Sequence, residues 1–331
     1  MRSLRVGLVG AGMIGRHHAR VLRELDDVEL VAIADPGGDP HGVGGDLKVL
    51  ADIADLIAVG VDYAVVAVPT RFHEGVGLQL AEAGIHALIE KPIAHSAAAG
   101  QRLTDAFSKA GLIGAVGHVE RYNPALIEMR RRLQLGELGE VFQITTRRQG
   151  PFPSRIADVG VATDLASHDV DLAAWIAGAP YTRVFAEVTH RSGRPHEDLI
   201  VISGRFGNGI VANHIVSWLS PMKERTTVVT GERGAFVADT LTGDLTFHAN
   251  GQVETEWASV AAFRGVTEGD VTRFAFQKRE PLRSEHEAFR DAVRGTNQSF
   301  VSLAEGLQAL RVVEAALESS RTRAVVHLQP Y

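Results

Sequence analysis

The feature that most constrains the fold of this chain is a glycine-rich turn near its start, Gly10-Ala11-Gly12-Met13-Ile14-Gly15. The turn follows an apolar run of strand length, LRVGLVG, and precedes a segment of helical periodicity, IGRHHARVLREL. The first glycine of such a GxGxxG turn permits a sharp bend, the second lets the backbone approach a pyrophosphate, and the third lets the helix pack closely. The helix N-terminus then offers free N–H groups to the anion. The pattern predicts that this segment binds a dinucleotide.

An acidic residue at the end of the next strand supports this interpretation. The run VELVAIAD ends in Asp35, about 20 residues after Gly15, where a carboxylate accepts hydrogen bonds from an adenosine ribose diol. A carboxylate would also repel a ribose 2′-phosphate, so NAD is preferred over NADP. Asp35 could instead only open the turn ADPGGDP, but the ordered combination favours cofactor binding. The expected cofactor contacts in this region are Gly10, Gly12, Met13, Ile14, Gly15 and Asp35.

The rhythm of the chain changes at about residue 120. Before it, near-continuous apolar runs such as YAVVAVP, HALIEKP and LIGAVGH alternate with helical stretches, which predicts an α/β, doubly wound parallel sheet of the Rossmann type over residues 1–120. After it, strands joined by Gly- and Asn-containing turns predict an α+β domain with a large, mostly antiparallel open sheet over residues 121–331. Two helices close this domain, and each is expected to begin at a serine N-cap, Ser284 or Ser302.

Composition excludes several classes of protein. The chain has 331 residues, which suits two domains, and a formal net charge of −6, which argues against nucleic acid or an anionic membrane as its main partner. With no cysteine it can have neither a disulfide nor a thiolate-bound metal. No apolar run approaches the roughly 18 residues of a membrane span. We therefore expect a cytoplasmic protein.

The stretch ATDLASHDVD, residues 162–171, carries the next signal for chemistry. Its polar residues could be metal ligands, a proton relay or the solvated face of a helix. Asp164 and His168 are four positions apart and so share one helix face, and histidine titrates near neutrality, which suits a base. A metal site is disfavoured, because Asp169 points to another face and no HExxH-type pattern accompanies the segment. Taken alone, the stretch favours an ordinary helix with Thr163 as N-cap.

The order of three motifs changes that balance. The glycine turn, then Glu90-Lys91-Pro92 after the fourth apolar run, then Asp164-x-x-x-His168 resembles the glucose–fructose oxidoreductase, inositol dehydrogenase and rhizopine-catabolism family (Gfo/Idh/MocA). The segments GHVERYNPA and GPFPSRIADVGVATDLASHDVDL look like its nucleotide-sugar branch, similar to UDP-N-acetylglucosamine 3-dehydrogenases. The chain departs from many relatives in carrying Val159-Gly160 where they have a glycine pair.

The resemblance implies site residues and a chemistry. Lys91, Asp164 and His168 would meet the substrate hydroxyls, and Glu90 would contact the nicotinamide ribose. Oxidation of a secondary alcohol needs a base for its proton. His168 is our choice, with Lys91 polarising the oxygen and Asp164 fixing a neighbouring hydroxyl, while Lys91 is the alternative base. The resemblance also implies that the open face of the second sheet pairs subunits into a homodimer or homotetramer.

Several further residues are candidates with a structural alternative for each. Pro69 and Thr70 follow the third apolar run, at the end of the sheet where ligands bind. Tyr122 and Asn123 lie in the expected domain connection and could face a sugar. Three arginines, Arg147, Arg148 and Arg155, could bind a diphosphate or form a solvated basic edge of the sheet. His17 and His18 are expected to be exposed helix residues.

These observations predict an NAD-dependent dehydrogenase that oxidises a ring hydroxyl of a sugar or nucleotide-sugar to a ketone, possibly UDP-N-acetylglucosamine at C3. The alternatives are an inositol or free-sugar dehydrogenase, or a non-catalytic sensor that binds the dinucleotide. Retention of Lys91, Asp164 and His168 argues against the sensor, because a binding protein needs no base. No metal is expected.

Overall fold

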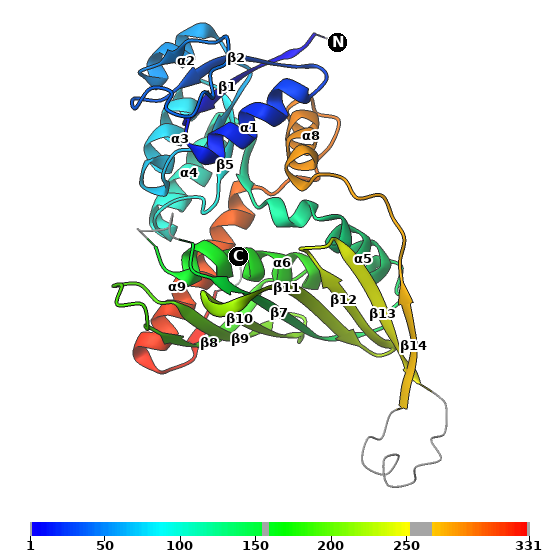
Figure 1. Cartoon of the computed structure of the whole chain (residues 1–331). Helices are drawn as coiled ribbons and strands as arrows, with labels where there is room; N and C mark the ends of the chain where they lie inside the picture. The colour runs from blue at the N-terminus through cyan, green and yellow to red at the C-terminus, as the bar shows by residue number, and fades with distance from the viewer. Residues whose placement is uncertain (1, 154–158, 252–266, 330–331) are drawn as a thin grey trace. The chain divides into compact units, whose positions relative to one another are not determined.

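The computed structural model describes residues 2–153, 159–251 and 267–329. The chain divides into two compact units (Figure 1): unit 1 comprises residues 1–119 and 280–311, and unit 2 comprises residues 120–279 and 312–331. The expected fold class, a Rossmann sheet followed by an α+β domain with a mostly antiparallel sheet, is confirmed.

Unit 1 is built on a parallel six-stranded sheet with the order β3-β2-β1-β4-β5-β6, the strand order of dinucleotide-binding Rossmann domains. The order in which strands are added reverses between β1 and β4: β2 and β3 lie on one side of β1, and β4, β5 and β6 lie on the other. The carboxyl ends of β1 and β4 therefore flank the ligand crevice of such folds. The strands are β1 (Leu4–Val9), β2 (Val28–Ala34), β3 (Val49–Leu50), β4 (Tyr63–Val66), β5 (His86–Glu90) and β6 (Gly114–Gly117).

Both faces of this sheet are buried, which explains its near-continuous apolar strands. Alternate residues of β4 enter different cores: Tyr63 and Val65 pack with residues of α1, whereas Ala64 and Val66 pack with residues of α3 and α4. The helices and short turns of this region are α1 (Met13–Glu24), α2 (Ile53–Val59), η1 (Thr70–Phe72), α3 (His73–Glu82) and α4 (Ala97–Ala110).

The C-terminal part of unit 1 departs from the expected organisation, in which residues 121–331 form one domain. Helix α8 (Pro281–Val293) and the first half of α9 (Leu303–Thr322) belong to unit 1. The physical reason is burial. Phe289 of α8 packs edge-on against Tyr63 of β4, with ring centroids 5.3 Å apart, and Val301 O accepts a hydrogen bond of 2.9 Å from Val116 N–H of β6.

Unit 2 contains a nine-stranded sheet with the order β14-β13-β12-β11-β7-β10-β9-β8-β15. The pairing is antiparallel throughout, except that β7 and β10 are parallel at its centre. Its strands are β7 (Val141–Pro151), β8 (Tyr181–Thr189), β9 (Leu199–Phe206), β10 (Val211–Ser217), β11 (Leu219–Gly231), β12 (Gly234–Asp239), β13 (Asp244–Gly251), β14 (Thr267–Arg273) and β15 (Val326–His327).

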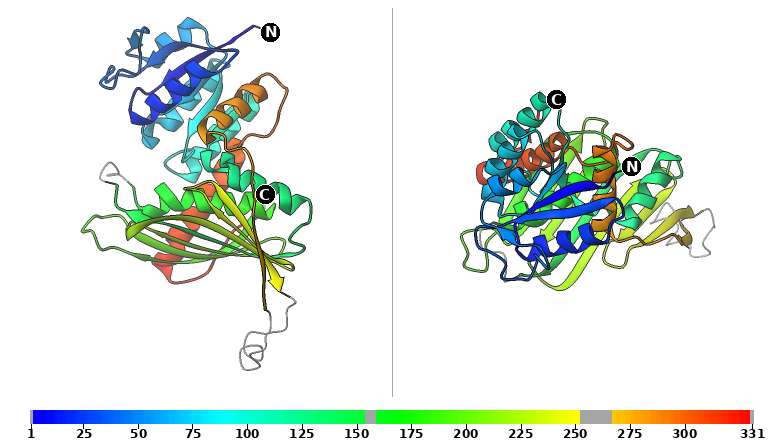
Figure 2. Two further views of the ribbon diagram at one scale, coloured as in Figure 1. Left: turned by 45° about the vertical axis from the view of Figure 1, so that its right-hand side comes forward. Right: turned by 90° about the horizontal axis from the view of Figure 1, so that it is seen from above.

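Helices α5 (Pro124–Gln134) and α6 (Ser167–Ala177) lie together along one face of this sheet, as the ribbon of unit 2 shows in Figures 1 and 2. The short turn η2 (Val119–Tyr122) leads into α5, and a π-helical turn, η3 (Ala162–Ala166), leads into α6. Helix α6 packs against β7 and β10, the central strands. Among the described residues, no helix is both long and apolar enough to cross a membrane.

Candidate active site

The glycine turn of unit 1 has the geometry that a pyrophosphate needs. Gly10 has a φ of +107°, and a Cβ on it would lie 2.5 Å from Ala67 O, so only glycine fits. A Cβ on Gly15 would lie 2.0 Å from Gly10 O, because the helix packs directly on the turn. Gly12, by contrast, has nothing within 4 Å of its ideal Cβ position. This open space before α1 is where a phosphate can approach the backbone.

Asp35 lies at the end of β2 beside the same turn. Its Oδ2 accepts a hydrogen bond of 2.8 Å from Ala11 N–H, and its Oδ1 accepts one of 2.7 Å from Gly37 N–H. Asp35 therefore stabilises both the glycine turn and the turn that follows β2. The carboxylate is fixed next to the glycine turn, and its binding of a cofactor ribose stays a prediction.

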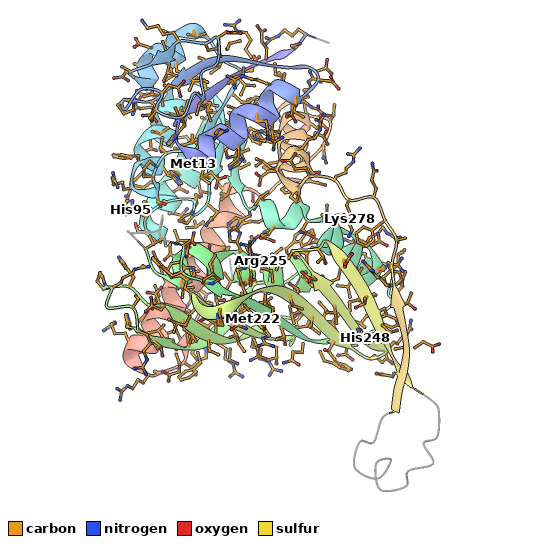
Figure 3. All side chains as sticks on the ribbon, viewed as in Figure 1. Met13, His95, Met222, Arg225, His248 and Lys278 are labelled. Carbon is orange, nitrogen blue, oxygen red and sulfur yellow. The ribbon has the colours of Figure 1, made fainter. Side chains whose placement is uncertain are left out.

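The other residues predicted to touch cofactor in this turn are exposed. Met13 and Ile14, at the start of α1, are 54% and 43% exposed, and Met13 is labelled in Figure 3. Helix α1 has no side-chain N-cap and no acidic residue in its first turn. The first turn of α1 therefore presents its N–H groups without an acidic side chain of its own, which suits an anionic ligand.

The loop after β4 carries Pro69, followed by Thr70 at the start of η1. This loop is tied to the Glu90-Lys91-Pro92 motif by His73, whose Nε2 lies 2.9 Å from Val68 O and whose Nδ1 lies 2.8 Å from Pro92 O. The Lys91–Pro92 peptide bond is cis. Burial lowers the pKa of His73, whereas hydrogen bonds to two carbonyl oxygens act to raise it, because both oxygens accept and only the doubly protonated ring donates to both. Sequence reasoning did not single out His73.

Glu90 is held by two neighbours in unit 1. Its Oε1 lies 2.9 Å from His18 Nε2, and its Oε2 accepts a hydrogen bond of 3.1 Å from Lys91 N–H. Burial acts to raise the pKa of Glu90, but the hydrogen bond and charge of His18 and the charge of Lys91 outweigh it and leave that pKa below its usual value. Glu90 is therefore a carboxylate at neutral pH, adjacent to the lysine that the resemblance assigns to the substrate.

His18 is not the exposed helix residue that we expected. It is only 1% exposed, and its Nδ1 lies 2.8 Å from His286 Nε2 on α8. Neighbouring Glu285 is also buried, and among the described residues neither of its carboxyl oxygens has a hydrogen-bond partner. Burial, reinforced by the charge of Glu90, raises the pKa of Glu285 well above its usual value. His17, in contrast, is exposed as expected.

In unit 2 the ATDLASHDVD stretch is buried, so it is not the solvated face of a helix. It begins as the π-helical turn η3 and continues as α6, whereas Thr163 lies inside η3 and is not an N-cap. Asp164 and His168 are each 9% exposed. A π-helical turn inserted before an α-helix is frequent at functional sites.

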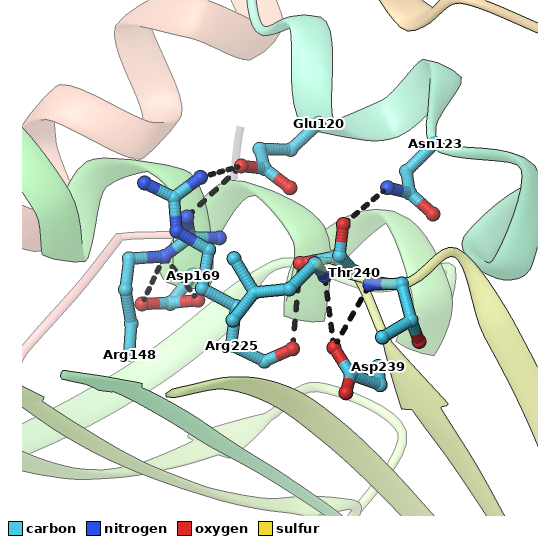
Figure 4. A network of polar contacts seen from close by, with 9 residues as sticks. Glu120, Asn123, Arg148, Asp169, Arg225, Asp239 and Thr240 are labelled. Carbon is cyan, nitrogen blue, oxygen red and sulfur yellow. Dashed lines mark hydrogen bonds and ion pairs between the residues drawn. The ribbon is translucent and has the colours of Figure 1, made fainter. Parts of the chain in front are cut away.

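Two carboxylates of this stretch are used within unit 2. Asp171 receives two hydrogen bonds from Arg121, from Nε at 2.8 Å and from Nη2 at 2.6 Å. Asp169 accepts from Arg148 Nε at 3.1 Å, and Arg148 also donates to Glu120 at 2.9 Å (Figure 4). The ion pairs anchor α6 to β7 and to the segment before α5. Within the described parts of the chain, no group of three or more His, Asp or Glu side chains could hold a metal ion.

These contacts revise the predicted arginine cluster. Arg148 is 3% exposed and neutralises the buried carboxylate of Asp169 and the partly buried one of Glu120, so it is unavailable for a diphosphate. Arg147, on the opposite face of β7, is largely exposed and lies 3.6 Å from Glu224. Arg155 lies outside the described residues. Another arginine, which the sequence did not indicate, Arg225, pairs with Glu120 at 3.4 Å (Figure 4).

Of the two candidate sugar contacts after β6, Tyr122 and Asn123, Asn123 has a structural role. Asn123 Oδ1 accepts a hydrogen bond from Ala125 N–H and so caps α5, while its Nδ2 donates to Thr240 O at 3.1 Å. Because both ends of its amide are engaged in unit 2, we omit Asn123 from the proposed sugar contacts. Tyr122 is partly exposed and His118 is buried.

Comparison with known proteins identifies the family. The model described as "Oxidoreductase family, NAD-binding Rossmann fold" matches residues 4–118, and the model described as "Oxidoreductase family, C-terminal alpha/beta domain" matches residues 130–328. The two matches together cover most of the chain. The chain belongs to the Gfo/Idh/MocA family of oxidoreductases.

Relatives within this family have several substrates. The chain is 28% identical over 324 residues to a UDP-N-acetylglucosamine 3-dehydrogenase of Acidithiobacillus ferrooxidans, with 96% of each chain covered. It is 34% identical over 192 residues to inositol 2-dehydrogenase 4 of Saccharopolyspora erythraea, covering 55% of this chain and 56% of that one.

Solved structures of the family show the same fold. The Acidithiobacillus ferrooxidans enzyme, GnnA, superposes with a TM-score of 0.83 at 23% identity, covering 97% of this chain and 99% of that one. The WlbA dehydrogenase of Bordetella pertussis, in complex with NADH and UDP-GlcNAcA, superposes with a TM-score of 0.83 at 22% identity, covering 100% and 99%.

As a Gfo/Idh/MocA protein, the chain is an oxidoreductase with an NAD-binding Rossmann domain. The glycine turn and Asp35 are the parts of its site that sequence reasoning described most fully. Sequence reasoning missed the buried partners of Glu90 and of α6, because each of these contacts joins residues that are far apart in the sequence. The only local signal for His18 was its position one helical turn after the glycines.

Proposed function

We propose that this protein is an NAD-dependent dehydrogenase that oxidises a ring hydroxyl of a sugar or nucleotide-sugar to a ketone. The observation that carries the proposal is the buried pair Asp164 and His168 at the start of α6, in a chain whose first domain belongs to an NAD-binding oxidoreductase family. A binding protein that only senses the dinucleotide needs no buried base in its second domain.

Oxidation of the alcohol removes one hydride and one proton. NAD, when bound, accepts the hydride from the carbinol carbon. His168 takes the hydroxyl proton, so the alcohol becomes a ketone without accumulating charge on its oxygen. Lys91 donates a hydrogen bond to the same oxygen, and Asp164 binds a neighbouring hydroxyl. We prefer His168 as the base because histidine as a residue type titrates near neutrality, which suits proton transfer at that pH.

The substrate we favour is a nucleotide-sugar, and the first candidate is UDP-N-acetylglucosamine oxidised at C3. The relative named for this activity matches 96% of the chain, whereas the inositol 2-dehydrogenase described above matches about half. Arg155 and Tyr122 are the candidate contacts for the nucleotide and the sugar. The second candidate is an inositol or free-sugar dehydrogenase, which the same comparisons favour at higher identity over the shorter span. We also propose a cytoplasmic homodimer or homotetramer.

The test is steady-state formation of NADH by the purified protein with NAD and a panel of substrates. The panel contains UDP-N-acetylglucosamine, related nucleotide-sugars, myo-inositol and simple aldoses. Turnover on a UDP-sugar alone supports the first candidate, and turnover on myo-inositol alone supports the second. If no member of the panel is oxidised while NAD still binds, the proposal is contradicted in favour of the sensor.

A further inference from the structure

The segment that carries Asp164 and His168 begins without a cap from its own side chains. Neither η3 nor α6 has a side-chain hydrogen bond at its N-cap position. The first helical hydrogen bond of the segment runs from Asp164 N–H to Gly160 O at 3.1 Å, so the helical winding starts at Gly160. The N–H groups of Val161 and Ala162 then precede the first turn and need acceptors from elsewhere.

Glu197, in the loop between β8 and β9, supplies both acceptors. Its backbone O accepts a hydrogen bond of 3.1 Å from Val161 N–H, and its side-chain Oε1 accepts one of 2.9 Å from Ala162 N–H. Glu197 is 8% exposed, so the bond to its carboxylate is shielded from water. A carboxylate is also the favourable charge at the start of a helix. Glu197 thus performs the function of an N-cap from a distant part of the chain.

Gly160 is required by this arrangement. A Cβ on Gly160 would lie 1.9 Å from Glu197 Oε1 and 2.1 Å from Glu197 Cδ. The φ of Gly160 is outside the left-handed region, so its backbone conformation is open to alanine. The conflict is therefore with the carboxylate alone. A methyl group at position 160 would displace the Glu197 side chain and break its bond to Ala162.

A second contact ties the same loop to the same segment. Arg194 donates a hydrogen bond of 2.7 Å to Val159 O, and its guanidinium lies over the rings of Phe152 and Trp218, 4.3 and 5.1 Å from their centroids. The β8–β9 loop therefore holds residues 159, 161 and 162 in succession.

We propose that Glu197 is a positioning residue, which fixes the start of η3 and through it the placement of Asp164 and His168. The inference rests on the proposed function, because its consequence for catalysis requires those two residues to meet the substrate. The placement itself is independent of the substrate. A displacement of about 1 Å in a reacting group lowers turnover by up to roughly 100-fold.

The test compares Gly160→Ala, Glu197→Ala, the double variant and Glu197→Gln in the full-length protein. The two single alanine variants should lower kcat by about 10- to 100-fold, with little change in KM for NAD, because the cofactor binds unit 1. The double variant should be no worse than either single variant, because both remove the same hydrogen bond. Glu197→Gln keeps an acceptor and should restore most of kcat. Gly207→Ala and Glu187→Ala are matched controls, since a Cβ on Gly207 makes only ordinary contacts and Glu187 is exposed.

Hydrogen exchange supplies a readout that does not depend on the substrate. The amide of Ala162, which bonds to the Glu197 side chain, should exchange faster in Gly160→Ala and Glu197→Ala than in the wild type and in Glu197→Gln. If the wild type oxidises no substrate, the proposed function fails while this exchange result still tests the placement. Additive losses in the double variant, or wild-type exchange and turnover in Glu197→Ala, would overturn the proposal. Equal losses in Glu197→Gln and Glu197→Ala would overturn it as well.

Discussion

Replacing Arg148 with methionine should destabilise unit 2 far more than the same change at Arg147, its neighbour on β7. The guanidinium of Arg148 is buried and lies 3.1 Å from Asp169 and 2.9 Å from Glu120. The guanidinium of Arg147 points to the other face of the strand, and its side chain is 52% exposed. The two variants remove the same charge and keep a similar stem, so their difference isolates the effect of burial.

The magnitude follows from what remains after each change. Without Arg148, Asp169 remains buried without its hydrogen-bonded cation, while Glu120 keeps only Arg225, 3.4 Å away; breaking a buried pair such as Arg148–Asp169 costs about 3–5 kcal/mol. Breaking the exposed pair of Arg147 costs at most about 1 kcal/mol. In the wild type, burial raises the pKa of Asp169 to about 6 although Arg148 opposes the shift. Without Arg148 this pKa rises further, so Asp169 takes up a proton on folding and the cost of Arg148→Met grows as the pH is raised above about 6.

Urea unfolding followed by tryptophan fluorescence is the appropriate assay. All three tryptophans, Trp175, Trp218 and Trp257, belong to residues 120–279 of unit 2, so the signal reports on that unit. Unfolding is measured at pH 6 and pH 8 for the wild type and both variants. Losses of equal size in Arg148→Met and Arg147→Met would refute the argument that buried ion pairs anchor α6. A loss for Arg148→Met that does not depend on pH would refute the role given to Asp169.

Three further predictions concern Asp35 and Glu285 of unit 1 and His168 of unit 2. Asp35→Ser should raise KM for NAD by roughly tenfold, as expected for a lost hydrogen bond to a charged group. The same change should narrow the preference for NAD over NADP. Unchanged NAD kinetics would contradict the role given to Asp35. His168→Ala should lower kcat by about two to four orders of magnitude, the usual contribution of a general base, and wild-type turnover would refute the assignment. Burial and the charge of Glu90 raise the pKa of Glu285. The folded wild type therefore loses stability as the pH rises from the usual glutamate pKa of 4.5 through that raised pKa. Glu285→Gln removes this loss and should stabilise unit 1 increasingly over the same pH range. Thermal unfolding at pH 5 and pH 8 tests the last prediction, and a difference that is constant with pH would contradict it.

The elements that sequence reasoning described well are those whose signals are local. The glycine turn and the acid after β2 lie within one βαβ unit, and the strands of unit 1 are apolar throughout because both faces of the sheet are covered. Ser302 caps α9 as expected, with its Oγ accepting from Glu305 N–H at 3.2 Å and Glu305 reaching back to Ser302. Ser284 does not cap α8, because that helix begins earlier, at Pro281. Proline favours the first helical position, so this boundary had a readable signal that we did not use.

What could not be predicted depends on contacts between distant segments. The pairing of Arg148 with Asp169, and the capping of Ala162 by Glu197, connect β7 and a loop to η3 and α6 with no sequence pattern to mark them. The assignment of α8 to unit 1 likewise follows from packing against β4, after a long excursion of the chain through unit 2. A hydrophobic or polar pattern reports which face of an element is buried, but not against which partner.

The central claim is that this protein transfers a hydride from a sugar hydroxyl to NAD. The most direct measurement is a single-turnover experiment with equimolar protein and NAD and each member of the substrate panel. The near-ultraviolet absorbance of reduced nicotinamide then reports hydride transfer even if the reduced cofactor is never released. The account predicts a rise to one equivalent of reduced cofactor with at least one sugar or nucleotide-sugar, and a much slower rise in His168→Ala. Binding of NAD with no reduction by any substrate would contradict it.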